Sequence, residues 1–194
     1  MLIVPALFDE ANKMRHFTVE IMRALDEAGI DTMLPDLPGT NESCEVLADQ
    51  SLSSWQSAMV GAAAYFEATH VLALRGGALC APSDLPCLRY APVKGVRVLN
   101  ALLRAQTLAD REAGRESTRE QLSEQGKSAG LTLAGYTLSP AMFRQLEEAN
   151  LPGHSFCDIA QTDIGGGGLW LRAEPDHDPD QARALARIVA ERLA

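Results

Sequence analysis

The stretch H-V-L-A-L-R-G-G-A-L-C-A, residues 70–81, decides the fold. It opens with Val71–Leu74, a short apolar run of the kind that forms a strand buried on both faces. The glycine pair Gly76 and Gly77 follows after one residue and permits a sharp turn. Apolar residues after the pair predict the start of a helix. The stretch therefore indicates a strand that passes through a tight turn into a helix, with Arg75 at the turn.

The chain before this stretch alternates between predicted strands and predicted helices. Leu2–Leu7 is a continuous apolar run and predicts a first buried strand. Asp9–Ala28 predicts a helix, because its apolar residues recur at spacings of three or four, and Asp31–Pro35 predicts a second strand. A second helix is expected at Ser53–Ala68. Three strands separated by two helices are typical of a mainly parallel, doubly wound α/β sheet with helices on both faces.

The second half begins with two helices that have polar faces, expected at Val96–Ala113 and Glu116–Gly126. They indicate a helical cap or insertion, about residues 96–130, over the carboxyl edge of the sheet. Short strands are expected at Leu131–Gly135 and Leu169–Arg172. Because neither a repeat nor a linker interrupts the pattern, residues 1–194 are expected to form a single domain.

Helix-start signals mark two further helices. Ser139 suits the N-cap position, with Pro140 at the first helical residue. The last helix begins with D-P-D-Q, in which Asp178 is expected to cap the helix and Gln181 stands at the third helical position. These two helices are therefore expected to begin directly after Ser139 and directly after Asp178.

Composition restricts the function classes. The net charge of −9 argues against nucleic acid and anionic membrane surfaces as partners. The four cysteines have no C-x-x-C spacing, so reduced thiols in a cytoplasmic protein are expected, without a zinc site or disulfide framework. The apolar start of the chain breaks at Pro5 and is too short for a signal peptide or membrane span. No metal or cofactor is expected.

The turn at Arg75 has the outline of the nucleophile elbow of α/β-hydrolases, in which the pattern G-x-S-x-G places a serine between strand and helix. The five residues here are A-L-R-G-G, residues 73–77, so arginine stands where that fold has serine. Arginine stays protonated and cannot act as an acyl nucleophile. The outline therefore indicates a hydrolase-like fold without its usual chemistry.

Several segments resemble the exosortase A system-associated hydrolases of the second type, bacterial α/β-hydrolase-fold proteins encoded with exopolysaccharide and exosortase genes. The resemblance covers roughly the whole chain, and its segments are F-D-E-A-N-K-M-R (Phe8–Arg15), L-P-D-L-P-G (Leu34–Gly39), S-S-W (Ser53–Trp55), L-R-G-G-A-L (Leu74–Leu79) and A-G-Y-T-L-S-P (Ala134–Pro140). It implies arginine at the elbow, although Ala73 stands where the family tends to have glycine. The chain also departs from that fold at its start, because there is no room for the two antiparallel strands that usually precede the first parallel strand, so Leu2–Leu7 would be the third strand.

Two interpretations of Arg75 remain open. In the α/β-hydrolase fold, the oxyanion hole would use the N–H groups of Gly76 and Phe8. Together with the guanidinium of Arg75, they would form a site for a carboxylate or phosphate. The alternative is an internal ion pair of Arg75 with Glu10 or Asp36, which is favoured because a part-buried arginine needs a partner.

His177 is the candidate catalytic histidine, because it follows the last expected strand and precedes the last helix. The alternative is a solvated histidine in an acidic loop, favoured since no serine is available for it to activate. The other histidines, His16, His70 and His154, lack the spacing of a metal site. Cys80 is expected in the core. The glycines of residues 165–168 lack a phosphate-loop frame and indicate an unusual turn.

Two functions follow from these observations. The first is a non-hydrolytic protein that binds a small anionic or acyl ligand, or acts in an accessory role with a protein partner or as a homo-oligomer. The resemblance associates this role with exopolysaccharide production. The second is an active esterase or thioesterase that uses another nucleophile or a water molecule with His177.

Overall fold

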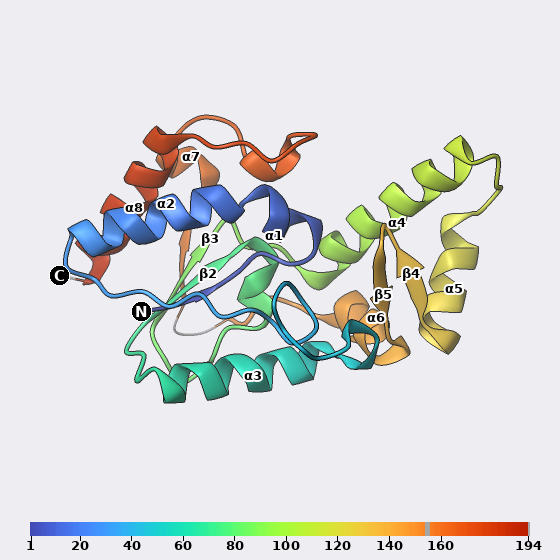
Figure 1. Cartoon of the computed structure of the whole chain (residues 1–194), viewed down its shortest axis with the longest axis horizontal. Coiled ribbons are helices and arrows are strands. Elements are labelled where there is room, and N and C mark those ends of the chain that lie inside the picture. The colour runs from blue at the N-terminus through green and yellow to red at the C-terminus, as the bar shows by residue number, and fades with distance from the viewer. Residues whose placement is uncertain (154–155, 194) are drawn as a thin grey trace.

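The computed structural model describes residues 1–153 and 156–193, which form a parallel sheet flanked by helices (Figure 1). The strands are β1 (Leu2–Val4), β2 (Val71–Leu74), β3 (Cys87–Tyr90) and β6 (Phe156–Ile159). They pair in the order β1-β2-β3-β6, and each pair is parallel. Every residue of β1 and β2 is buried, which explains their uninterrupted apolar sequences. The expectation of a parallel α/β sheet is confirmed.

The strand expected at Asp31–Pro35 is reduced to a single parallel bridge between Leu2 and Met33. The N–H of Ile3 donates to the Met33 carbonyl over 2.8 Å, while the N–H of Leu2 donates to the His70 carbonyl over 2.9 Å. Consecutive N–H groups of a strand point in opposite directions. The segment at Met33 therefore flanks β1 on the side opposite β2.

Helices cover both faces of the sheet. One apolar cluster joins Ile3 and Leu72 to residues of α2 (Arg15–Glu27) and α8 (Pro179–Leu193). The other joins Val4 and Ala73 to α3 (Leu52–Tyr65), whose Trp55 is fully buried. Successive strand residues contribute to opposite clusters, as the alternation of side chains in a strand requires. Figure 1 shows α2 and α8 on one side of the strands and α3 on the other.

The chain between β3 and β6 forms an insertion at the carboxyl end of the sheet (Figure 1). It consists of α4 (Gly95–Glu112), α5 (Arg119–Ala129), the antiparallel pair β4 (Leu131–Leu133) and β5 (Tyr136–Leu138), and α6 (Pro140–Glu148). The two helices expected at residues 96–113 and 116–126 correspond to α4 and α5. The strand expected at 131–135 exists as β4, but it pairs with β5 outside the main sheet.

Both predicted helix starts are confirmed. The Ser139 hydroxyl accepts a hydrogen bond of 3.0 Å from the N–H of Met142, with Pro140 as the first residue of α6. The Asp178 carboxylate accepts one of 3.1 Å from the N–H of Gln181. Each cap satisfies an N–H group that the first turn of a helix leaves without a carbonyl partner.

The prediction of a strand at Leu169–Arg172 is wrong. Leu169–Leu171 is the 3-10 helix η3, because the N–H groups of Leu171 and Arg172 donate to carbonyls three residues earlier rather than to a neighbouring strand. The place beside β3 belongs instead to β6, which the sequence pattern did not reveal. The helix expected after the turn at Arg75 is only the 3-10 helix η2 (Arg75–Leu79), and β3 follows it without an intervening α-helix. The remaining elements are α1 (Asp9–Lys13), α7 (Gln161–Ile164) and the 3-10 helix η1 (Leu47–Asp49).

Candidate functional site

The elbow at Arg75 packs directly against the loop that follows β1. Arg75 comes immediately after β2 and has a φ of 53°, a left-handed conformation that costs a non-glycine residue about 1–3 kcal/mol. A Cβ atom on Gly77 would lie 2.2 Å from the Pro5 carbonyl oxygen, and one on Gly76 would lie 3.1 Å from Cγ of Leu7. Gly77 is therefore required by the close approach of two backbones, whereas Gly76 packs tightly against the side chains of Leu7 and Val98.

The guanidinium of Arg75 is held by the protein's own groups. Its Nε donates to Oε2 of Glu10 over 3.2 Å, and its Nη2 donates to Oε1 over 3.1 Å. The Nη1 group donates to the Ala91 carbonyl over 2.6 Å. The guanidinium carbon lies 3.8 Å from the ring centroid of Trp170. Arg75 is only 9% exposed, so this forked ion pair offsets much of the cost of burying its charge.

Two further left-handed residues support this arrangement. Phe8 has a φ of 55° and precedes α1, the short helix that carries Glu10. Ala91 has a φ of 43° and directly follows β3. Conformations of this kind persist only where the surrounding structure enforces them, and they cluster at binding and active sites. The chain thus turns sharply after each of three neighbouring strands, and two of the turns supply partners to Arg75.

The glycine-rich segment at residues 165–168 positions Trp170 over Arg75. The side-chain amide of Gln161 donates to the Gly165 carbonyl over 2.8 Å, and that of Gln181 donates to the Gly167 carbonyl over 3.2 Å. A Cβ on Gly166 would lie 2.5 Å from Nε2 of Gln181. Gly166 therefore allows the close contact with Gln181, and two glutamine side chains hold the loop through its carbonyl groups.

Asp36 organises its own loop rather than pairing with Arg75. Its carboxylate accepts a hydrogen bond of 2.8 Å from Nδ2 of Asn41 and one of 3.1 Å from the N–H of Glu42. This is the strand-end turn chemistry typical of aspartate beside proline and glycine. Of the two partners considered for Arg75, the structure brings Glu10 to it.

His177 lies beside α2. Its ring stacks on that of His16, with the centroids 4.4 Å apart and the planes inclined by 18°. The N–H of His177 donates to Oδ1 of Asp176 over 2.7 Å. That hydrogen bond, together with the Arg172 guanidinium, lowers the pKa of the Asp176 carboxyl. The stacking partner is thus a residue of α2 and not a group at the elbow, while His154 lies outside the described residues.

Cys80, which directly follows η2, is fully buried, and burial raises the pKa of its thiol. A thiol with a raised pKa has little of the nucleophilic thiolate at neutral pH. Its place in the core agrees with the expectation from the sequence.

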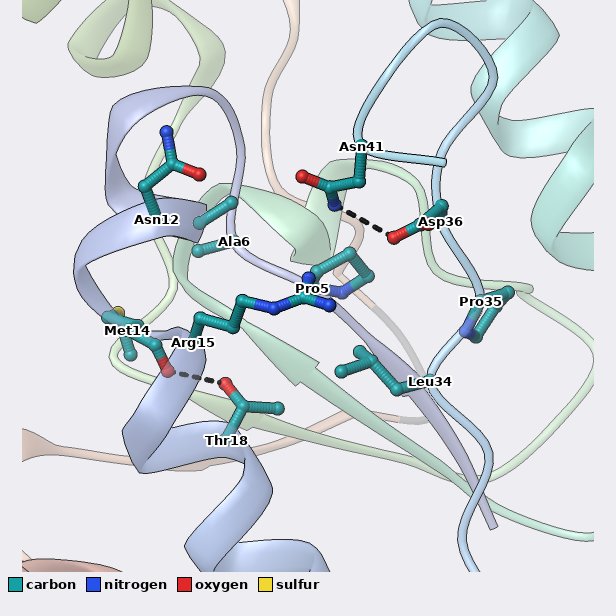
Figure 2. Close-up of a pocket in the computed structure, with 11 residues that line it drawn as sticks. Pro5, Ala6, Asn12, Met14, Arg15, Thr18, Leu34, Pro35, Asp36 and Asn41 are labelled. Carbon is teal, nitrogen blue, oxygen red and sulfur yellow. Dashed lines mark hydrogen bonds between the residues drawn. The ribbon is translucent and has the colours of Figure 1, made fainter. Parts of the chain in front are cut away.

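A small pocket opens beside the carboxyl end of β1, between the α1–α2 junction and the loop after Met33 (Figure 2). Asn12, Arg15, Asp36 and Asn41 contribute polar groups to it, and its apolar lining includes Pro5 and Leu34. The Arg15 side chain extends across the pocket in Figure 2. Arg15 is exposed and forms neither a hydrogen bond nor an ion pair within the described part of the chain. The enclosed space is about 20 Å³, room for one or two water-sized groups.

Sequence reasoning missed three participants. The Ala91 carbonyl and Trp170 contact Arg75 through the fold alone, and Arg15 reaches the pocket through a break in the first helix. The expected helix at Asp9–Ala28 is divided at Met14 into α1 and α2, so Arg15 begins a new helix. Trp170 carried one signal, its position immediately after the glycine-rich segment.

Within residues 1–153 and 156–193, no three His, Cys, Asp or Glu side chains gather as a metal site would require. None of the helices described is both long and apolar enough to cross a membrane. Comparison of the chain with models of known protein families and with curated protein sequences found no match.

Proposed function

We propose that this protein is a hydrolase-like binding protein that lacks serine-hydrolase chemistry and holds a small anionic or acyl ligand at the carboxyl edge of its sheet. The observation that carries the proposal is the state of Arg75. It occupies the elbow, and its guanidinium is bound to Glu10, to the Ala91 carbonyl and to the Trp170 ring. A protonated guanidinium is not a nucleophile, so the elbow braces the fold instead of attacking a substrate.

The ligand would bind in the pocket beside β1, where Arg15 is the available cation. Ligands of open α/β sheets bind outside the carboxyl ends of the strands, where this pocket lies. A carboxylate or phosphate would pair with the Arg15 guanidinium and accept hydrogen bonds from the second amide hydrogens of Asn12 and Asn41. The first hydrogens of these amides bind the Tyr136 hydroxyl and the Asp36 carboxylate, which also lines the pocket. Because the enclosed space is small, the acid group alone would enter, and the remainder of the ligand would extend outward.

The resemblance to exosortase A system-associated hydrolases belongs to the same proposal. It supports a hydrolase-like ancestry with arginine at the elbow, and it associates the ligand with exopolysaccharide production in the bacterial cytoplasm. Fold likeness does not establish activity, so the role rests on the site residues.

Hydrolysis is tested with p-nitrophenyl esters of short acids and with acyl-CoA thioesters, using the purified protein and the His177→Ala variant. We expect rates equal to the buffer background for both proteins. Turnover by the wild type that disappears in His177→Ala would overturn the proposal in favour of a working esterase.

Binding is tested by thermal denaturation in the presence of acetate, malonate, glucuronate or phosphate. A bound ligand raises Tm, since it stabilises the folded state by RT ln(1 + [L]/Kd). We expect at least one of these anions to raise Tm of the wild type, and Arg15→Gln to abolish the rise. Arg23→Gln is the matched control, because Arg23 lies on the same helix and pairs with Glu20 away from the pocket. An equal rise in all three proteins, or none in the wild type, would contradict the assignment of Arg15.

A further inference from the structure

The outer face of α4 carries a regular stripe of exposed residues. Arg97, Ala101, Arg104, Leu108 and Arg111 follow one another at spacings of four, three, four and three residues, and all five are exposed. This spacing places the five residues in one seam along the helix, in which arginines alternate with Ala101 and Leu108. Leu108 lies within the seam and is 56% exposed. The seam is exposed, while α4 buries its opposite face in the core.

An open groove of about 370 Å³ accompanies this stripe where α4 faces the start of α5. Arg104, Leu108, Arg111 and Arg119 are among its lining residues. The guanidinium of Arg119 donates to Oδ1 of Asn100 at one end of the groove. Arg104 and Arg111 form no hydrogen bond or ion pair with any residue that the structure describes. The groove therefore combines two uncompensated cations with an exposed leucine.

The charge of this region opposes that of the chain. Residues 94–119 contain six basic and three acidic residues, a net charge of +3 in a chain whose total is −9. Of the basic side chains, Arg115 is neutralised by Asp110, 2.7 Å away. Arg111 lies in the last turn of α4, where a positive charge interacts favourably with the helix dipole. Arg104 lies in the middle of the helix and has no such structural role.

We propose that this groove binds an acidic amphipathic helix of a partner protein, independently of the ligand pocket. Arginines seven residues apart on α4 are about 10.5 Å apart along the helix axis, so carboxylates at heptad spacing on a second helix would match them. Apolar residues of that helix would contact Leu108 and Ala101. Exposed ion pairs contribute little each because water and salt screen them, so the leucine contact is needed and the complex would be transient.

The mixed chemistry of the groove favours a helix over a polyanion. Nucleic acid is bound mainly through many contacts to its phosphates, without a need for an apolar centre. Here a leucine stands between Arg104 and Arg111, and acidic residues dominate the rest of the chain. An acidic helix satisfies both the cations and the leucine.

The test is fluorescence anisotropy with a fluorescein-labelled peptide of three heptads, which has leucine and glutamate on one helical face. We expect saturable binding that weakens with salt. The Arg104→Glu/Arg111→Glu variant should raise Kd at least about tenfold, because attraction of the peptide's glutamates becomes repulsion. Leu108→Ser should raise it by about threefold through lost apolar contact. A peptide with lysine in place of glutamate should not bind.

The matched control is Arg23→Glu/Arg187→Glu, which changes the charge equally on α2 and α8 and should stay within about twofold of the wild type. Equal weakening by both double variants, or no peptide binding to the wild type, would overturn the proposal. So would tighter binding of phosphatidylserine vesicles or of single-stranded RNA than of the peptide. Sedimentation of the wild type as a dimer that Arg104→Glu/Arg111→Glu dissociates would assign the groove to a second copy instead.

Discussion

Replacement of Arg75 by methionine should destabilise the protein strongly, because the change removes one partner of a mostly buried ion pair. The Glu10 carboxylate, 23% exposed, would lose its cation, and the Ala91 carbonyl would lose the donor 2.6 Å away. Removing one member of a fully buried pair costs about 3–5 kcal/mol, and the residual exposure of Glu10 places the cost near the lower end, about 3 kcal/mol. For a chain of this size, that loss corresponds to a fall in Tm of roughly 6–12 °C.

The pairwise contribution follows from a double-mutant cycle with Glu10→Gln. In the Glu10→Gln background no carboxylate is left unpaired, so Arg75→Met should cost roughly half as much as in the wild type. Arg75→Lys should fall between the two, because lysine keeps the charge but loses the forked contact.

The free energy of unfolding is measured by urea denaturation with far-UV circular dichroism. Tryptophan fluorescence is unsuitable as the sole probe, because Trp170 contacts Arg75 directly. A cost below about 0.5 kcal/mol for Arg75→Met, or an identical cost in both backgrounds, would refute the view that Arg75 braces the elbow through Glu10.

Three further predictions concern packing, thiols and acid stability. Gly77→Ala should destabilise the protein by more than about 2 kcal/mol, since the new Cβ would lie 2.2 Å from the Pro5 carbonyl oxygen. Gly61→Ala is the control in the same urea assay, and it should stabilise the protein by about 0.5–1 kcal/mol because Gly61 lies in an open helical position. A thiol assay with Ellman's reagent at pH 8 should detect the exposed Cys44 and Cys157 rapidly, and Cys80 and Cys87 only after unfolding. Cys80 and Cys87 are buried, and burial raises the pKa of Cys87 to about 12. Rapid reaction of all four thiols would contradict this prediction. Hydrogen bonds from Ser117 and Arg115 lower the pKa of Asp110, so its contribution to stability is complete above its unfolded pKa near 4 and is lost as the pH falls through the lower folded value. Asp110→Asn should therefore flatten the decrease of Tm between about pH 5 and 2, and an unchanged slope would argue against this role.

Local patterns predicted the elements whose sequences reflect their own environment. The apolar runs of β1 and β2 are buried on both faces, and the caps at Ser139 and Asp178 act within a single helical turn. The caps are satisfied by groups within the same turn, and an uninterrupted apolar run predicts a buried strand whichever elements cover it.

The strands β3 and β6 escaped prediction because each carries a charge. Arg89 and Asp158 lie opposite each other in the parallel register, and the Arg89 Nε donates to Oδ1 of Asp158 over 2.6 Å. The buried charge of Arg89 is compatible with a strand because the Asp158 carboxylate and the Pro152 carbonyl accept its hydrogen bonds. Residues that are 69 positions apart supply that compensation, so neither strand shows it alone.

By itself, the sequence determined an alternation of strands and helices, an arginine at the turn after a buried strand, and a glycine pair directly after that arginine. Only the tertiary structure decided what Arg75 binds. Glu10 and Asp36 were both available in the sequence, but the left-handed turn at Phe8 begins the helix that brings Glu10 to the guanidinium, while Asp36 is satisfied by Asn41 in its own loop. The choice depends on how segments distant in the chain pack together, and that packing is a property of the fold.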